Sequence, residues 1–76
     1  MKYEINEDVK TRLDNNFSYH APKNGQAEKY VEIRDNARDL AYLLVQSCPQ
    51  SRELSVALTN LEDAVMWANA SIARNE

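Results

Sequence analysis

The 76-residue sequence has very few of the residues from which turns, disulfide bridges and metal sites are built. It contains one glycine, two prolines, one cysteine and one histidine. One cysteine excludes an intrachain disulfide, and no cysteine and histidine residues have the spacing of zinc ligands. Below about 80 residues a domain usually needs such a staple or self-association in addition to its core. We therefore expect the chain to associate with copies of itself.

The chain also lacks an excess of positive charge and any long apolar run. Its net charge is −3 and its isoelectric point is near 5.1, which argues against DNA or RNA polymers as partners because affinity for their backbone comes from many lysine and arginine contacts. A small anion needs only two or three local cations. No apolar run approaches the ~18 residues of a membrane span, and the start MKYEINEDVK is not a signal peptide. We expect a cytoplasmic protein without a membrane partner.

What the sequence does contain is apolar residues at helical spacing. Ile5, Val9 and Leu13 recur at every fourth position, and Asn6 is a suitable N-cap. These residues predict a short helix over 6–15, followed by a loop.

Two longer segments, 26–47 and 51–74, predict an antiparallel helical hairpin. In both, apolar side chains recur at alternating steps of three and four, which places them on one face of a helix. They are Tyr30, Ile33, Ala37, Leu40 and Leu44 in the first segment, and Leu54, Leu58, Leu61, Val65, Ala68 and Ile72 in the second. Pro49 ends the first segment because proline has no amide hydrogen, and Ser51 can cap the second. The expected fold is all-α, a short helix plus a long hairpin in one domain.

The segment 51–74 carries a second stripe, made of small side chains around one large ring. Its members are Ala57, Asn60, Ala64, Trp67 and Ser71. Small side chains allow another helix to approach closely, so this face requires a second partner. Either the helix over 6–15 covers the stripe within the chain, or the stripe is a subunit interface. A thin core favours the interface.

The loop over 16–25 concentrates aromatic and cationic side chains. Phe17, Tyr19 and His20 are its rings, and Lys23 is its cation. This combination suits a nucleotide, because a base stacked on an aromatic ring contributes about 1–3 kcal/mol and a charge-assisted contact with phosphate about 1.5–3 kcal/mol. The alternative is that Phe17 and Tyr19 only plug the open end of the hairpin.

No residue pattern indicates an enzyme. His20 has no serine or cysteine motif around it. The adjacent acids Glu62 and Asp63 point about 100° apart on a helix, so they cannot share a substrate. The acids of 26–47 interleave with lysine and arginine, as on an ion-paired exposed face. Because phosphate-cradling glycine loops, zinc motifs and catalytic triads are missing from the sequence, we expect no catalysis, no metal and no cofactor.

Four stretches together resemble a known family. They are FSYHAPKNGQAEKY, IRDNARDLA, CPQSREL and ALTNLEDAVMWANASIARNE. From about Phe17 onward, the sequence is similar to the phage anti-CBASS cyclic-nucleotide sponges, which share a helical-hairpin family with the anti-Thoeris sponges. The run AVMWANA-x-IAR at 64–74 is the most specific part of the resemblance. Anti-Thoeris members often carry an added N-terminal β-region, so the short helix expected over 6–15 favours the anti-CBASS type.

The resemblance implies a non-catalytic phage protein that sequesters cyclic oligonucleotides and thereby blocks CBASS-type antiviral immunity in the infected bacterial cell. Cyclic dinucleotides such as cyclic GMP-AMP are the implied ligands, and some members of the family hold cyclic trinucleotides at separate three-fold sites. It also implies a compact homohexamer with pockets between protomers. Two alternatives remain open, namely a protein interaction module without a nucleotide ligand and a phosphodiesterase that destroys the messenger.

The resemblance further implies seven ligand-binding residues, Tyr19, His20, Lys23, Arg34, Arg52, Thr59 and Arg74. The first four stand where contacts with a cyclic dinucleotide are expected. Arg52 and Thr59 are polar residues of the third helix that cap it, bridge subunits or contact ligand. Arg74 lies near the end of that helix, where copies of the chain could converge on a three-fold axis around a cyclic trinucleotide.

Overall fold

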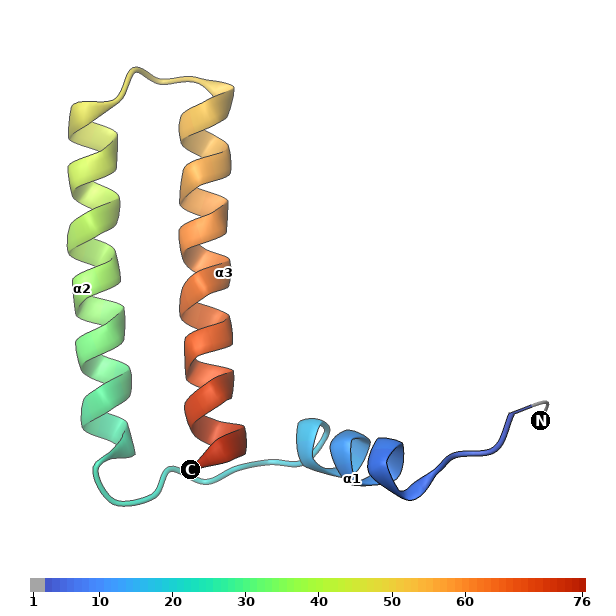
Figure 1. The fold of residues 1–76 in the computed structure, drawn as a ribbon. Coiled ribbons are helices and arrows are strands. Elements are labelled where there is room, and N and C mark those ends of the chain that lie inside the picture. Colours follow the sequence, from blue (N-terminus) through green and yellow to red (C-terminus); the bar gives the residue numbers. More distant parts are fainter. Residues whose placement is uncertain (1–2) are drawn as a thin grey trace.

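The computed structural model describes residues 3–76, and over that range the chain forms three helices and no strand (Figure 1). They are α1 (Glu7–Asn16), α2 (Gln26–Ser47) and α3 (Arg52–Asn75). The all-α class with a short first helix and a long hairpin is confirmed. The sequence predicted helices over 6–15, 26–47 and 51–74. In the structure α2 has the predicted bounds, and α1 and α3 each begin and end one residue later than predicted.

The helix α1 begins as its capping residue predicts and then runs away from the hairpin (Figure 1). The side-chain oxygen of Asn6 accepts a hydrogen bond from the Val9 amide over 2.8 Å, and the acids of the first turn complement the helix dipole. At the other end, the Phe17 amide bonds to the Leu13 oxygen over 2.9 Å. Of the predicted apolar stripe, Val9 is half-buried, whereas Leu13 is 37% exposed and Ile5, which precedes the helix, is 68% exposed.

The helices α2 and α3 lie side by side and antiparallel (Figure 1). Leu54 is buried at one end of α3, and the other residues of its predicted stripe are half-buried. In α2 the prediction was wrong at one position, because Leu40 is 44% exposed and Ala41 is half-buried in its place. With 3.6 residues per turn, the inward face advances from Ala37 to Ala41 and Leu44.

Local sequence sets where the hairpin helices begin and end. Gly25 precedes α2 with φ of 82°, a left-handed conformation that glycine adopts without steric cost. At the turn between α2 and α3, Cys48 is an exposed free thiol, and Pro49 follows it. The Ser51 hydroxyl accepts a hydrogen bond from the Leu54 amide over 3.2 Å, as expected for the N-cap of α3.

The core of the single chain is very small. Among residues 3–76, Leu54 is the one buried apolar residue, at 9% accessibility, and Gln26 is the one buried polar residue, at 3%. Trp67 remains 67% exposed. The alternative that the first helix covers the stripe around Trp67 is therefore wrong for the single chain, because α1 points away from the hairpin (Figure 1) and the indole stays exposed.

Within the same range, none of the helices combines the length and the apolarity needed to cross a bilayer.

Candidate functional site

A hollow of about 440 Å³ lies at the base of the hairpin, where the loop after α1 meets α2 and the last turns of α3. Its walls come from all three parts of the chain. They are Asn16, Ser18, Tyr19, His20, Tyr30, Asn69, Ala70, Ala73 and Arg74. Three of the seven residues expected from the resemblance therefore share one surface, namely Tyr19, His20 and Arg74.

The loop wall of this hollow is fixed by hydrogen bonds to its neighbours. His20 Nε2 lies 2.7 Å from the backbone oxygen of Asn15, and because a carbonyl oxygen only accepts, Nε2 carries the hydrogen. The side-chain amide of Asn15 donates in turn to the backbone oxygen of Arg74 over 3.1 Å. The Ser18 hydroxyl donates to the backbone oxygen of Asp14. The loop is thus tied to the end of α1 and, through Asn15, to α3.

The rings of this loop are open to solvent. Tyr19 is 87% exposed and Phe17 is 85% exposed. A plug would bury these rings against the hairpin, so the alternative that they merely close its open end is wrong for the single chain. Tyr19 instead presents a free aromatic face beside the half-buried rings of His20 and Tyr30, an arrangement suited to stacking with a planar ligand.

Asn69 adds a polar group that sequence reasoning did not identify. It lines the hollow from α3, and its side-chain oxygen is buried without a hydrogen-bond partner among the described residues. An unsatisfied buried acceptor costs about 1–3 kcal/mol. The sequence feature that could have identified Asn69 is its position as a single asparagine between Ala68 and Ala70, on the half-buried side of α3. A ligand, a water molecule or another copy of the chain could supply the missing donor.

Lys23 belongs to a separate basic cluster at the same end of the molecule. Its side chain donates to the backbone oxygen of Glu76, and Lys29 Nζ lies 2.6 Å from Oε2 of the same residue. The buried amide of Gln26 donates to Glu76 Oε1 over 3.2 Å. The hydrogen bond from Lys29, followed by that from Gln26, lowers the pKa of the Glu76 carboxyl below its ordinary value of 4.5.

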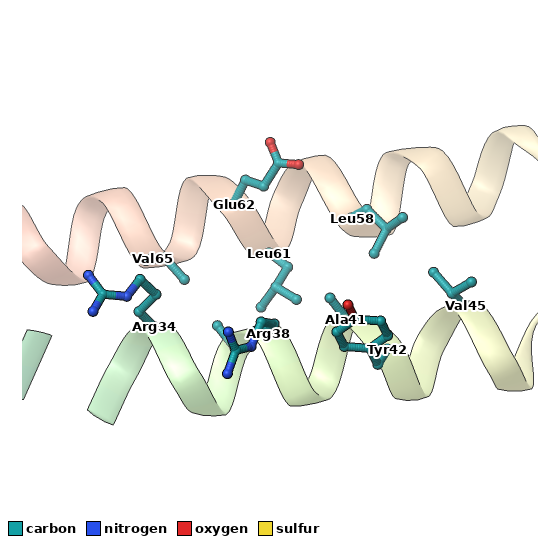
Figure 2. Close-up of a pocket in the computed structure, with 10 residues that line it drawn as sticks. Arg34, Arg38, Ala41, Tyr42, Val45, Leu58, Leu61, Glu62 and Val65 are labelled. Atoms are coloured by element: carbon teal, nitrogen blue, oxygen red, sulfur yellow. The ribbon is translucent and has the colours of Figure 1, made fainter. Parts of the chain in front are cut away.

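Arg34 lines a different depression, a groove of about 590 Å³ between α2 and α3 (Figure 2). Leu58, Leu61 and Val65 point from α3 toward α2, and Glu62 points away (Figure 2). Ala37, Ala41, Tyr42 and Val45 complete the apolar wall, with Arg38 next to Arg34 along α2. The groove shares no lining residue with the hollow at the base, so one chain does not bring Arg34 beside Tyr19.

The remaining expected residues lie apart from both depressions. Arg52 is the first residue of α3, at the turn end of the hairpin, and Thr59 lies farther along the same helix. Both are exposed and line neither the hollow nor the groove. Arg74 lines the hollow and also a smaller one of about 350 Å³ that it shares with Arg12 and Trp67. Across residues 3–76, His, Cys, Asp and Glu side chains form no group of three that could hold a metal ion.

Comparison with known proteins identifies a family. The model of the family described as Acb2/Tad1, hairpin domain, matches residues 9–73, from the first turn of α1 into the last turn of α3. No curated protein and no solved structure matches the chain.

Proposed function

The chain belongs to the Acb2/Tad1 hairpin family, the family of the anti-CBASS sponges, and we propose that it binds cyclic oligonucleotide messengers and releases them unchanged. In an infected bacterium, such binding would keep the effectors of CBASS immunity from meeting their activator in the cytoplasm. Cyclic dinucleotides such as cyclic GMP-AMP are the proposed ligands, and cyclic trinucleotides are a second ligand class.

The observation that supports this proposal most directly is the exposed ring of Tyr19 beside His20, Tyr30 and Arg74 in one hollow. A cyclic dinucleotide has two flat bases and two anionic phosphodiesters. Stacking on Tyr19 suits a base, at about 1–3 kcal/mol, and the guanidinium of Arg74 suits a phosphate because charge-assisted hydrogen bonds are the stronger ones.

One chain by itself does not account for tight binding. Sequestration requires nanomolar affinity, about −12 kcal/mol, and the hollow is open on one side. The other proposed contacts, Lys23, Arg34, Arg52 and Thr59, lie elsewhere on the same chain. We propose that a homohexamer brings residues of different protomers to one ligand. The exposed Trp67, Leu43 and Val45 support self-association, because a small monomer rarely leaves so much apolar surface in water.

The test is to recover the ligand. The protein is incubated with cyclic GMP-AMP, separated from free ligand, heat-denatured and chromatographed. Intact cyclic GMP-AMP in the released fraction is the expected result. Linear product would instead identify a phosphodiesterase. Absence of uptake would favour a protein interaction module, whose binding surface would be the stripe of α3 around the exposed Trp67, while the apolar groove of Figure 2 is a separate surface.

A further inference from the structure

A carboxylate is held in the basic cluster at the base of the hairpin. Lys29 Nζ lies 2.6 Å from Glu76 Oε2, and Gln26 Nε2 donates to Glu76 Oε1 over 3.2 Å. Lys23 reaches the backbone oxygen of the same residue. Donors from α2 thus bind both oxygens of the Glu76 carboxylate, and the ammonium group of Lys23 lies beside them.

The donor at the centre of this cluster is held in place before any ligand arrives. Gln26 is 3% exposed. Its side-chain oxygen accepts from the Lys23 amide over 2.9 Å, and its side-chain nitrogen also reaches the Ile72 oxygen at 3.4 Å. Since its rotamer is fixed by these contacts, Gln26 presents an N–H without a further ordering cost. It is also the first residue of α2, where the helix dipole favours an anion.

The two charged partners, by contrast, are only partly shielded from solvent. The side chains of Lys29 and Glu76 are 52% and 41% exposed. Exposed ion pairs contribute little to stability. A phosphodiester presents two anionic oxygens to both lysines and to the Gln26 amide. It can therefore displace a side-chain carboxylate that is held so weakly.

We infer that Lys23, Gln26 and Lys29 form a binding site for a phosphodiester, and that the Glu76 carboxylate occupies this site in the free chain as an internal competitor. The inference rests on the proposed function, because a cyclic oligonucleotide supplies the phosphodiester. It adds two binding residues, Gln26 and Lys29, and gives Glu76 a role in setting the affinity.

The place of the cluster in the fold supports this assignment. Lys29 directly precedes Tyr30, which lines the hollow, and Glu76, the C-cap of α3, follows Arg74 by two residues. A base in the hollow and a phosphodiester at the lysines would therefore lie at the same end of the hairpin.

Two carboxylate substitutions with the same change in charge test the inference. Glu76→Gln removes the competitor, and Asp14→Asn removes the carboxylate that pairs with Lys10 over 3.2 Å on α1, outside the cluster. Calorimetric titration with cyclic di-AMP at low salt should show Glu76→Gln binding about two- to fivefold more tightly than wild type, as expected when an exposed ion pair no longer competes. Asp14→Asn should bind like wild type.

A lysine substitution makes the test independent of how Glu76→Gln folds. Lys29→Gln should weaken binding about tenfold, the effect of losing one charge-assisted contact, and Glu76→Gln should give no gain in the Lys29→Gln background. Equal affinities of wild type, Glu76→Gln and Lys29→Gln would overturn the inference while leaving the sponge function intact. No binding of cyclic di-AMP or cyclic GMP-AMP by any variant would instead overturn the proposed function.

Discussion

Asn15 in α1 donates a hydrogen bond from its side-chain amide to the backbone oxygen of Arg74, near the end of α3, over 3.1 Å. The backbone oxygen of Asn15 is also the partner of His20 at 2.7 Å. One residue therefore connects the first helix, the aromatic loop and the last helix. Because α1 otherwise runs away from the hairpin, this connection fixes the beginning of the loop, and the contacts of Lys23 fix its end (Figure 1).

Asn15→Ala should release α1 without unfolding the hairpin. The lost side-chain hydrogen bond corresponds to about 0.5–1.5 kcal/mol, and the cost should be local because α2 and α3 make few contacts with α1. Hydrogen exchange measured by mass spectrometry should accelerate in residues 7–20 and stay unchanged in α2 and α3. Asn36→Ala, at an exposed position of α2, is the control. Uniform acceleration across all three helices would contradict this role of Asn15.

Tyr19→Ala should weaken the binding of cyclic GMP-AMP at least tenfold, about 1.4 kcal/mol, because a stacking ring is lost. Tyr3→Ala is the matched control, since Tyr3 is also 87% exposed but lines neither the hollow nor the groove of Figure 2. Calorimetry measures both affinities, and circular dichroism verifies that the helix content is unchanged. Equal affinities of the two variants would remove Tyr19 from the binding site.

Arg34→Ala should also weaken binding, and the loss should be larger at low salt. The lost interaction is ionic, and the screening length grows from about 10 Å at 0.1 M to about 30 Å at 0.01 M ionic strength. The measurement is the ratio of mutant to wild-type dissociation constants at two salt concentrations. A ratio of one at both would place Arg34 outside the ligand site and leave it as a residue of the α2–α3 groove.

Ala64→Glu should dissociate the proposed oligomer. Ala64 and Trp67 are exposed on α3 in the single chain, and a carboxylate forced into a close helix contact would be buried without a partner. Ala27→Glu, at an exposed position of α2, makes the same chemical change elsewhere. Light scattering should show a smaller mass for Ala64→Glu alone. A monomeric wild type would refute the oligomer itself, and an unchanged mass of Ala64→Glu would refute this interface.

The Glu76 contact predicts a pH dependence of stability. Its pKa is lowered in the folded chain, so the carboxylate stabilises the fold fully above the ordinary pKa of 4.5 and loses this contribution as pH falls through the lowered value. The melting temperature of wild type relative to Glu76→Gln should therefore be constant near neutral pH and decrease below about pH 4.5. A difference that does not change with pH would show that Lys29 and Gln26 do not stabilise the ionised form.

Helical periodicity and capping chemistry made most of the fold predictable. Asn6 and Ser51 cap the helices for which they were proposed, and Leu58, Leu61 and Val65 of the α3 stripe point toward α2 (Figure 2). Leu40 was misplaced because a step of three from Ala37, which reaches Leu40, and a step of four, which reaches Ala41, both fit a helical repeat. In the structure the half-buried residue is Ala41. The direction of α1 could not be predicted, since the hydrogen bond that joins it to α3 runs from Asn15 to a residue 59 positions away.

The candidate site was predictable only in part. Tyr19 and His20 stand out in a short aromatic loop, and the structure places Arg74 beside them. Asn69 and Gln26 gave no comparable signal, because a buried amide looks like any surface amide until its neighbours are known. Lys23, Arg34, Arg52 and Thr59 lie on different parts of one chain, and contacts between copies are not encoded in the periodicity of one helix.

The turn between α2 and α3 has a practical consequence. Cys48 is the only cysteine of the sequence, its thiol is exposed, and it lies at the opposite end of the hairpin from the hollow (Figure 1). Cys48 follows Tyr30 by eighteen positions, about 27 Å at 1.5 Å per residue. A maleimide fluorophore attached there would report on tumbling and on distances between labelled chains without touching the aromatic loop, and no cysteine would first have to be removed or introduced.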